Sequence, residues 1–286
     1  MSPAVHQERI YIVAALVTAG LGLQVAVGRG LITGAASPQL GVAWLMVLAV
    51  TAVAAAGSGW ATRPPQAAEP GALPVGRLPL VRLPLDIVVP SLLAAGLALF
   101  VQLFENGLLQ GAIVVLGGFV FGAVLWAQSY ARYVNTSRFA LAQTALNVIS
   151  HLTAFLFFSV IYGLKLRSSI AAPAVGVVAA LLLFELLSRD AAWHKAMSLP
   201  VASRRTTVGW LALAGGLVAG ELTWGLNYWA ALSTLIGGAF LLVVFYILHG
   251  LASSYVDRRL GRQVILEYSA VGAIAVAVVL VSAFVS

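Results

Sequence analysis

The sequence contains no cysteine, and only 9% of its 286 residues are charged. The absence of cysteine excludes disulfides, thiolate nucleophiles, zinc–thiolate sites and iron–sulfur clusters. The shortage of charge excludes an ordinary water-soluble enzyme, in which about 25% of residues are charged, and it excludes an intrinsically disordered chain. Since 61% of the residues are hydrophobic, lipid must be the solvent for most of the molecular surface.

Catalytic motifs are also lacking. There is no glycine-rich phosphate loop, no paired-histidine metalloprotease motif and no nucleophile elbow. A haem between His151 and His249 is disfavoured, because counting residues from the predicted helix ends puts the two side chains at depths roughly 9 Å apart. The identity of any cofactor stays open.

Nine apolar runs are long enough to cross a bilayer, which takes about 20 residues per helix. They predict an all-α, polytopic transmembrane bundle of about nine spans. The chain is expected to divide into a two-helix hairpin (1–60), a linker (61–86) that holds six of the eleven prolines, and a seven-helix bundle (87–286). The runs are residues 10–27, 40–60, 87–104, 108–128, 139–163, 170–187, 208–227, 230–254 and 270–284.

The basic residues orient this bundle, because cytoplasmic loops retain lysine and arginine. With a cytoplasmic N-terminus and an outside C-terminus, all but three of the sixteen basic residues lie inside; the exceptions are Arg29, Lys165 and Arg167. The net charge of +7 is then explained by contact with anionic lipids, without a nucleic-acid partner. We expect an integral protein of a bacterial cytoplasmic (inner) membrane. The first run is long for a signal peptide and lacks a convincing cleavage site, so we expect it to be retained.

The run at 139–163 carries the richest set of intramembrane polar side chains. Gln143, Asn147 and His151 recur every four residues and share one helix face, with Thr144 beside them. His151 lies about 18 Å along this run, near the bilayer midplane. The set predicts a polar path for protons or a small solute, with His151 as the titrating group. Two alternatives stay open: the same side chains could ligate or hydrogen-bond a buried cofactor, or they could simply form hydrogen bonds between helices.

A second polar set is expected toward the cytoplasmic side. Glu185 and Arg189 are four residues apart, in the favourable order for a helical ion pair. Tyr246 and His249 share a face of a later run. A structural ion pair is a sufficient explanation of Glu185 and Arg189. Because His249 is titratable, we also keep this inner cluster as a candidate functional site.

An outer pocket is the third hypothesis. Gln102 and Glu105 end one span, and Glu221, Trp224 and Asn227 end another on the same side. Glu221 lies about 10 Å below the predicted surface, where a carboxylate needs a partner or water. The pattern fits two interpretations equally well. One is a pocket that binds a cation, an amine or a lipid headgroup; the other is a belt of aromatic and polar residues at the membrane interface.

Glycine is placed where helices could approach closely. The pair Gly117-Gly118 recurs as Gly237-Gly238 in a later span, a similarity that chance explains. Four further pairs share a helix face, and such faces serve internal packing or association with a second copy or another membrane protein. They are Gly30/Gly34, Gly107/Gly111, Gly118/Gly122 and Gly216/Gly220.

Three functions remain open from the sequence. A small transporter or permease-like protein accounts for the polar path. An accessory or assembly subunit of a larger membrane complex accounts for the glycine faces and for the missing catalytic set. A membrane-embedded lipid or isoprenoid enzyme, or a cofactor binder, is the least favoured of the three.

Overall fold

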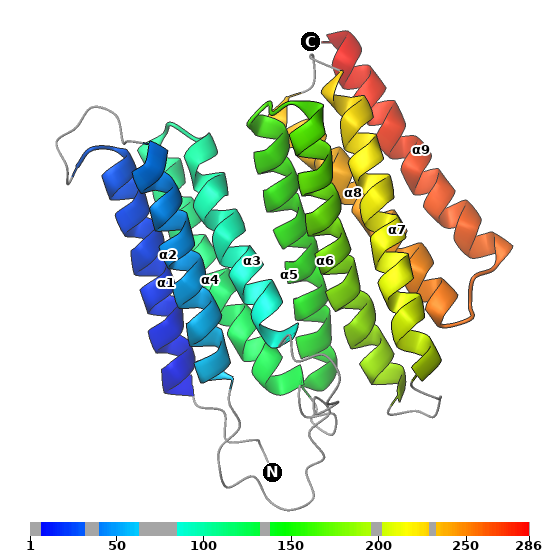
Figure 1. Cartoon of the computed structure of the whole chain (residues 1–286), viewed down its shortest axis with the longest axis horizontal. Helices are drawn as coiled ribbons and strands as arrows, with labels where there is room; N and C mark the ends of the chain where they lie inside the picture. The colour runs from blue at the N-terminus through cyan, green and yellow to red at the C-terminus, as the bar shows by residue number, and fades with distance from the viewer. Residues whose placement is uncertain are drawn as a thin grey trace, which may run out of the picture. The chain divides into compact units, whose positions relative to one another are not determined.

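The structure is a computed structural model that describes residues 7–31, 40–62, 85–131, 138–195, 202–228 and 233–285. These ranges contain nine α-helices, one short 3-10 helix and no strand (Figure 1). The predicted all-α class is therefore confirmed for the described residues. The proline-rich linker lies almost entirely outside them, and the division of the chain into 1–60, 61–86 and 87–286 stays a prediction.

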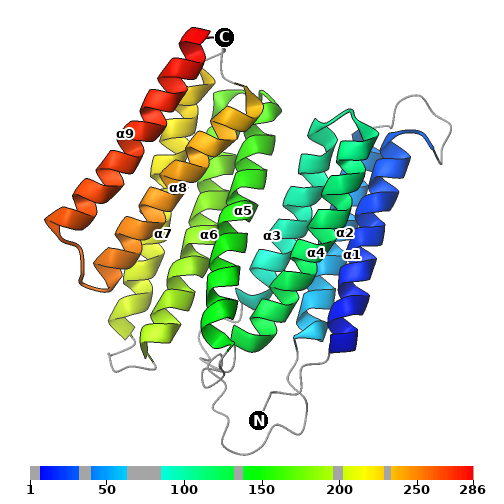
Figure 2. The same cartoon turned by 180° about the vertical axis from the view of Figure 1, so that it is seen from behind.

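The first of two compact units comprises Met1–Ile149. In it α1 packs against α2 and α4, and α2 packs against α3. One face of α1 is buried through Val13, Val17 and Leu21, spaced four residues apart. Ile12 and Leu16 lie away from this face and are exposed. The helices are α1 (Gln7–Gly28), α2 (Leu40–Ala61), α3 (Leu85–Phe100), η1 (Val101–Leu103) and α4 (Gly107–Ala131), seen from behind in Figure 2.

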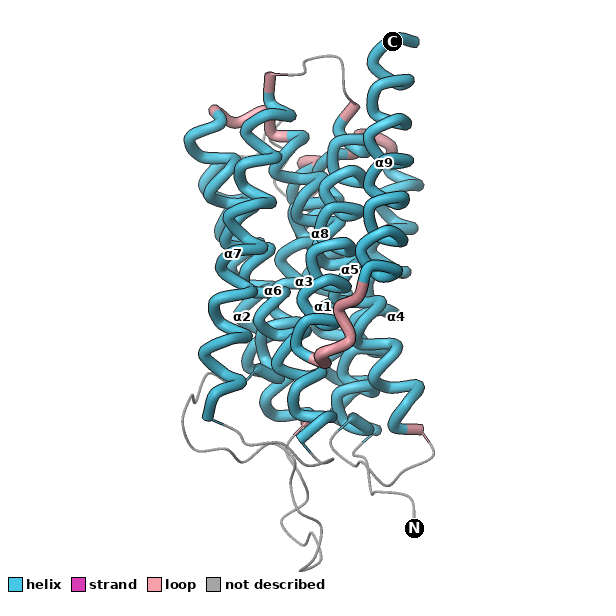
Figure 3. The backbone as a smooth tube through the Cα atoms, turned by 90° about the vertical axis from the view of Figure 1, so that its right-hand side faces the viewer, coloured by secondary structure: helices cyan, strands magenta, loops and turns pink. Residues whose placement is uncertain are grey.

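The second unit comprises Ser150–Ser286, so the boundary between the units lies within α5 (Phe139–Gly163). Helices α6 and α7 pack along much of their length, and α8 packs against α6, α7 and α9 (Figure 3). The helices that follow α5 are α6 (Ser168–Lys195), α7 (Ala202–Asn227), α8 (Thr234–Val256) and α9 (Arg262–Val285).

Small residues allow the close α6–α7 contact. A Cβ added to Gly216 would lie 2.5 Å from the carbonyl oxygen of Gly176, and one added to Gly220 would lie 2.9 Å from that of Ala172. In lipid, where no hydrophobic effect joins helices, such backbone approach supplies much of the attraction between them. This glycine face is therefore occupied within the chain.

Seven of the helices are long and apolar enough to cross a membrane. The exceptions are α3, which has 16 residues, and α7, whose several glycines and Glu221 lower its mean hydropathy. Three helices extend at least six residues beyond their predicted apolar runs, namely α6, α7 and α9, because helical hydrogen bonding continues past the ends of the hydrophobic stretch. The chain is a multi-pass helical membrane protein by length and composition, while the ninefold span count and the orientation stay predictions.

Candidate functional site

The second unit contains a group of polar side chains that meet between α5, α6 and α8. We call this group the polar cluster. It joins part of the predicted inner cluster to His151, the last residue of the predicted α5 path, although the sequence predicted these as two separate sets. Its members are Ser150 and His151 of α5, Glu185, Arg189 and Asp190 of α6, and His249 and Ser253 of α8.

Two glycines bring α8 close enough to α5 for the cluster to form. A Cβ on Gly237 would lie 2.5 Å from the ring of Tyr162, and a Cβ on Gly238 would collide with Ser159. Only hydrogen fits at these two positions, so the helices approach more closely than larger residues allow. His249 lies three turns further along α8.

An ion pair forms the α6 side of the cluster. Arg189 Nε lies 2.7 Å from Glu185 Oε1, and the two side chains are only 16% and 5% exposed. The same guanidinium donates from its second terminal nitrogen to Ser150 Oγ at 3.0 Å. The predicted i,i+4 pair is confirmed, and it neutralises two charges that would be costly to bury singly.

Asp190 connects α6 to α8. Its Oδ2 atom accepts a hydrogen bond from Ser253 Oγ at 3.2 Å and lies 3.5 Å from His249 Nε2. His249 is 7% exposed, so a nearby carboxylate is the natural counter-charge for its protonated form. The pair can therefore hold a proton with its charge balanced.

The two histidines of the cluster lie edge to face. The ring centroids of His151 and His249 are 5.3 Å apart. The predicted depth mismatch of roughly 9 Å is wrong, because depth counted from helix ends assumes that all helices end at one level, and tilted or staggered helices do not. Depth therefore does not disfavour a haem between these two histidines, and whether a cofactor binds stays open. Within the described part of the chain, no group of three or more histidine, aspartate and glutamate side chains is arranged to hold a metal ion.

Two aromatic rings of α8 lie beside His151 of α5. Phe245 is buried and lies 5.3 Å from His151 between ring centroids. Tyr246 is 47% exposed, and its ring lies 5.9 Å from His151. The cluster is thus closed by Phe245 on one side and reaches the protein surface at Tyr246.

The rest of the predicted α5 path belongs to the first unit. Gln143 and Asn147 are half-buried on the face that leads to His151, whereas Thr144 is exposed. The Thr144 hydroxyl donates to the Ala140 carbonyl of its own helix at 3.1 Å. A transport path along α5 stays a prediction.

The outer-pocket residues fall into both units and are described separately. In the second unit, Glu221 and Trp224 are exposed, and the Trp224 indole donates to the Tyr228 hydroxyl at 3.1 Å. Asn227 donates to Ser168 Oγ at 3.3 Å, which ties the end of α7 to the start of α6. A single outer pocket stays a prediction.

In the first unit, Gln102 lines a cavity of about 190 Å³ together with Gln24, Arg29 and Gln110. Arg29 donates to Gln110 Oε1 at 2.7 Å and to the backbone carbonyl of Glu105. Glu105 therefore contacts Arg29 through its backbone carbonyl and not through its carboxylate. A backbone contact of this kind cannot be predicted from the residue type.

Residue types in the sequence predicted four members of the polar cluster (His151, Glu185, Arg189 and His249), but not Ser150. Its hydroxyl is completely buried and bonds to Arg189. The only available signal was its position next to His151, on a helix expected to contact its neighbours.

One comparison with known proteins identifies a relationship. No curated protein and no solved structure matches the chain. A family model matches residues 24–282, which is most of the sequence. The chain therefore belongs to the family described as Protein of unknown function (DUF5656).

Proposed function

We propose that this chain is a small permease-like membrane protein that passes protons through the polar cluster. The observation that carries the proposal is the contact series His151–His249–Asp190, made by three titratable side chains on three different helices. Ionisable side chains are rare within membrane helices, and those that occur commonly mark proton relays or ion pathways.

The chemistry of the series suits proton exchange. An imidazole can accept a proton on one ring nitrogen and release one from the other. The Asp190 carboxylate, 3.5 Å from His249 Nε2, supplies the negative charge that a protonated His249 needs. Ser253 holds that carboxylate in position through its hydroxyl.

The Arg189–Glu185 pair has a structural role in the polar cluster. Because its two charges cancel, it adds little net field at the histidines, and through Ser150 it fixes the residue next to His151. We infer that it positions α5 against α6 and does not itself exchange protons.

Proton flux into proteoliposomes tests the proposal. The purified full chain is reconstituted with a pH-sensitive dye inside the vesicles, and a potassium diffusion potential drives uptake. We expect uptake above that of empty vesicles, reduced at least tenfold by His249→Gln and by Asp190→Asn, since each removes a titratable group.

Thr223→Val is the matched control. Thr223 is a fully buried polar residue of the same unit whose hydroxyl bonds within its own helix, to the Ala219 carbonyl at 2.8 Å. Its replacement leaves every titratable group in place, so flux should be unchanged. Equal flux in wild-type, His249→Gln and empty vesicles would refute the proposal.

A second candidate, an accessory subunit of a larger membrane complex, is favoured by α9. Only 6% of the apolar stretch of α9 is buried within the chain, so most of the helix surface is available to lipid or to another protein. A photo-crosslinking residue in place of the exposed Ile274 distinguishes these cases in native membranes. A specific protein adduct supports the subunit function, and adducts with lipid alone contradict it.

A further inference from the structure

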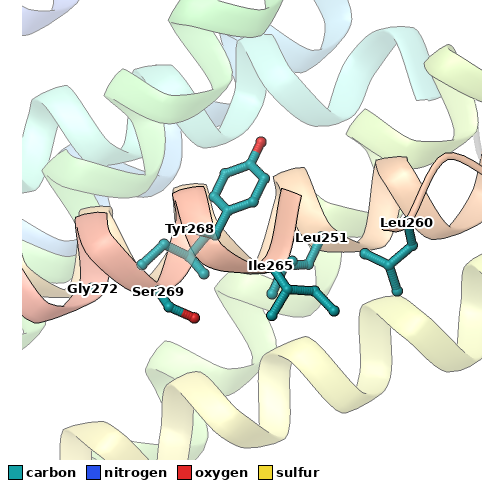
Figure 4. Close-up of a pocket in the computed structure, with 7 residues that line it drawn as sticks. Leu251, Leu260, Ile265, Tyr268, Ser269 and Gly272 are labelled. Atoms are coloured by element: carbon teal, nitrogen blue, oxygen red, sulfur yellow. The ribbon is translucent and has the colours of Figure 1, made fainter. Parts of the chain in front are cut away.

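A surface groove runs between α8 and α9, close to the turn that joins these two helices. Its volume is about 480 Å³. Figure 4 shows side chains from both helices around it, with the Tyr268 ring and the Ser269 hydroxyl on opposite sides of α9. The lining is almost entirely apolar and includes Ile247, Leu251, Leu260, Ile265, Tyr268 and Gly272.

Three exposed arginines flank the groove residue Leu260 in the chain, in the turn between α8 and α9 and at the first residue of α9. They are Arg258 and Arg259, which precede Leu260, and Arg262, which begins α9. The acidic residues nearby are Asp257, which is half-buried, and Glu267, which accepts a hydrogen bond from Gln263 at 3.1 Å. Within residues 257–267, three arginines therefore outnumber two acidic residues.

The length of the groove fits one lipid chain. From Arg262 to Gly272 α9 rises about 15 Å, at about 1.5 Å per residue. That is half of the roughly 30 Å hydrocarbon thickness of a bilayer, or the depth of one leaflet. The arginines stand at the headgroup end of this length and the apolar lining covers the rest.

Two glycines shape the groove. A Cβ at Gly250 would collide with the Tyr268 hydroxyl, so glycine lets this ring lie against α8 as a wall. At Gly272 a Cβ would lie 3.4 Å from Ile247, in ordinary contact. Alanine therefore fits at position 272, whereas a phenylalanine would occupy the groove.

We propose that this groove binds one anionic phospholipid, with its phosphate on Arg258, Arg259 and Arg262 and one acyl chain along α9. The occupant is specified by charge complementarity at one end and apolar length at the other. The inference is independent of the proposed proton path, because it uses none of the polar cluster.

Native mass spectrometry of the full chain in mild detergent tests the site, with phosphatidylglycerol and phosphatidylcholine added as probes. We expect one phosphatidylglycerol to be retained in preference to phosphatidylcholine. Because a surface arginine contributes about 1 kcal/mol to anionic lipid binding, Arg259→Gln and Arg262→Gln should each weaken retention about five-fold.

The backbone supplies a matched control. Arg258 has a positive φ of 57°, and the exposed Lys165 elsewhere in the unit has a φ of 47°. Asparagine tolerates this conformation, so Arg258→Asn and Lys165→Asn remove one charge each with similar backbone demands. Arg258→Asn should weaken phosphatidylglycerol binding about five-fold, and Lys165→Asn should leave it unchanged.

The acyl-chain contact is tested apart from charge. Gly272→Phe should abolish the preferential site while Gly272→Ala preserves it. Equal retention of the two lipids, or equal losses in Arg258→Asn and Lys165→Asn, would overturn the proposal. So would undiminished phosphatidylglycerol binding in Gly272→Phe.

Discussion

The two units bury different kinds of polar group. In the first unit, the buried polar side chains within the described residues are amides and hydroxyls, such as Gln24 and Ser58. In the second unit, the buried set includes the ionisable Glu185 and His249. Neutral groups need only a hydrogen bond in a low-dielectric interior, whereas ionisable groups also need a counter-charge.

Close helix packing does not account for this difference, because both units use it. A Cβ added to Gly117 of α4 would lie 3.0 Å from the Leu97 side chain, and one added to Gly237 of α8 would lie 2.5 Å from the Tyr162 ring. What separates the units is the chemistry placed between the helices. We infer that the first unit is mainly a scaffold and that the second carries the reactive groups.

The largest expected effect follows from breaking the buried ion pair. Arg189→Leu leaves the Glu185 carboxylate, which is 5% exposed, without its cation. Removing one partner of a buried pair costs about 3–5 kcal/mol. Chemical denaturation in detergent should show a loss of that size in the free energy of unfolding.

The double variant Glu185→Leu/Arg189→Leu sharpens this test. With both charges replaced by apolar groups, most of the lost stability should return. A double variant as unstable as Arg189→Leu alone would mean that shape and not charge matters at this position.

A smaller effect is expected at the glycine contacts, and it should differ between the units. Gly216→Ala places its Cβ 2.5 Å from a backbone oxygen and 2.7 Å from the Ala180 Cβ, so α6 or α7 must shift at a cost of about 1–3 kcal/mol. In Gly118→Ala, the three atoms nearest to the new Cβ all belong to the Thr18 side chain. Rotation of the Thr18 hydroxyl relieves this contact but breaks its hydrogen bond to the Ala14 carbonyl, so the cost should lie at the lower end of this range. Thermal unfolding in detergent measures both.

Gly225→Ala is the control for this pair. Gly225 lies on α7, and a Cβ added there would meet no side chain or neighbouring backbone within 4 Å, so alanine should cost nothing here and, through its higher helix propensity, should slightly stabilise the helix. Because alanine has the higher helix propensity, equal destabilisation at positions 216 and 225 would show that close approach of the helices does not govern these glycines.

The smallest effect is expected in the first unit. Gln24 donates to the Ala98 carbonyl at 2.8 Å, which joins α1 to α3. Gln24→Leu removes one neutral hydrogen bond and should lower the free energy of unfolding by about 1 kcal/mol. A loss of unfolding free energy as large as that of Arg189→Leu would contradict the inference that the described part of the first unit buries only polar groups that need a single hydrogen bond.

Local features of the polar cluster could be predicted from sequence, and features between helices could not. The Glu185–Arg189 pair follows from a four-residue spacing on one helix. The contact of His151 with His249 depends on how far α8 is displaced along α5, and no periodicity within either helix encodes that displacement. The close approach of Gly237 and Gly238 to α5 decides it, and glycine pairs are too common in this sequence to identify their partners.

The same distinction holds for the fold. Long apolar runs predicted the helices, but α6, α7 and α9 extend past those runs, since hydropathy reports the lipid-facing length and not the hydrogen-bonded length. The grouping of α1 and α2 with α3 and α4 in one unit is likewise a property of packing between helices.

One flux measurement tests the division between the units most directly. Full-length His249→Gln and Gln24→Leu are reconstituted at equal protein content, and potential-driven proton uptake is compared with that of the wild-type chain. We predict that His249→Gln lowers uptake at least tenfold and that Gln24→Leu keeps it within twofold of wild type. Uptake that survives in His249→Gln, or is lost in Gln24→Leu alone, would contradict the assignment of proton exchange to the second unit.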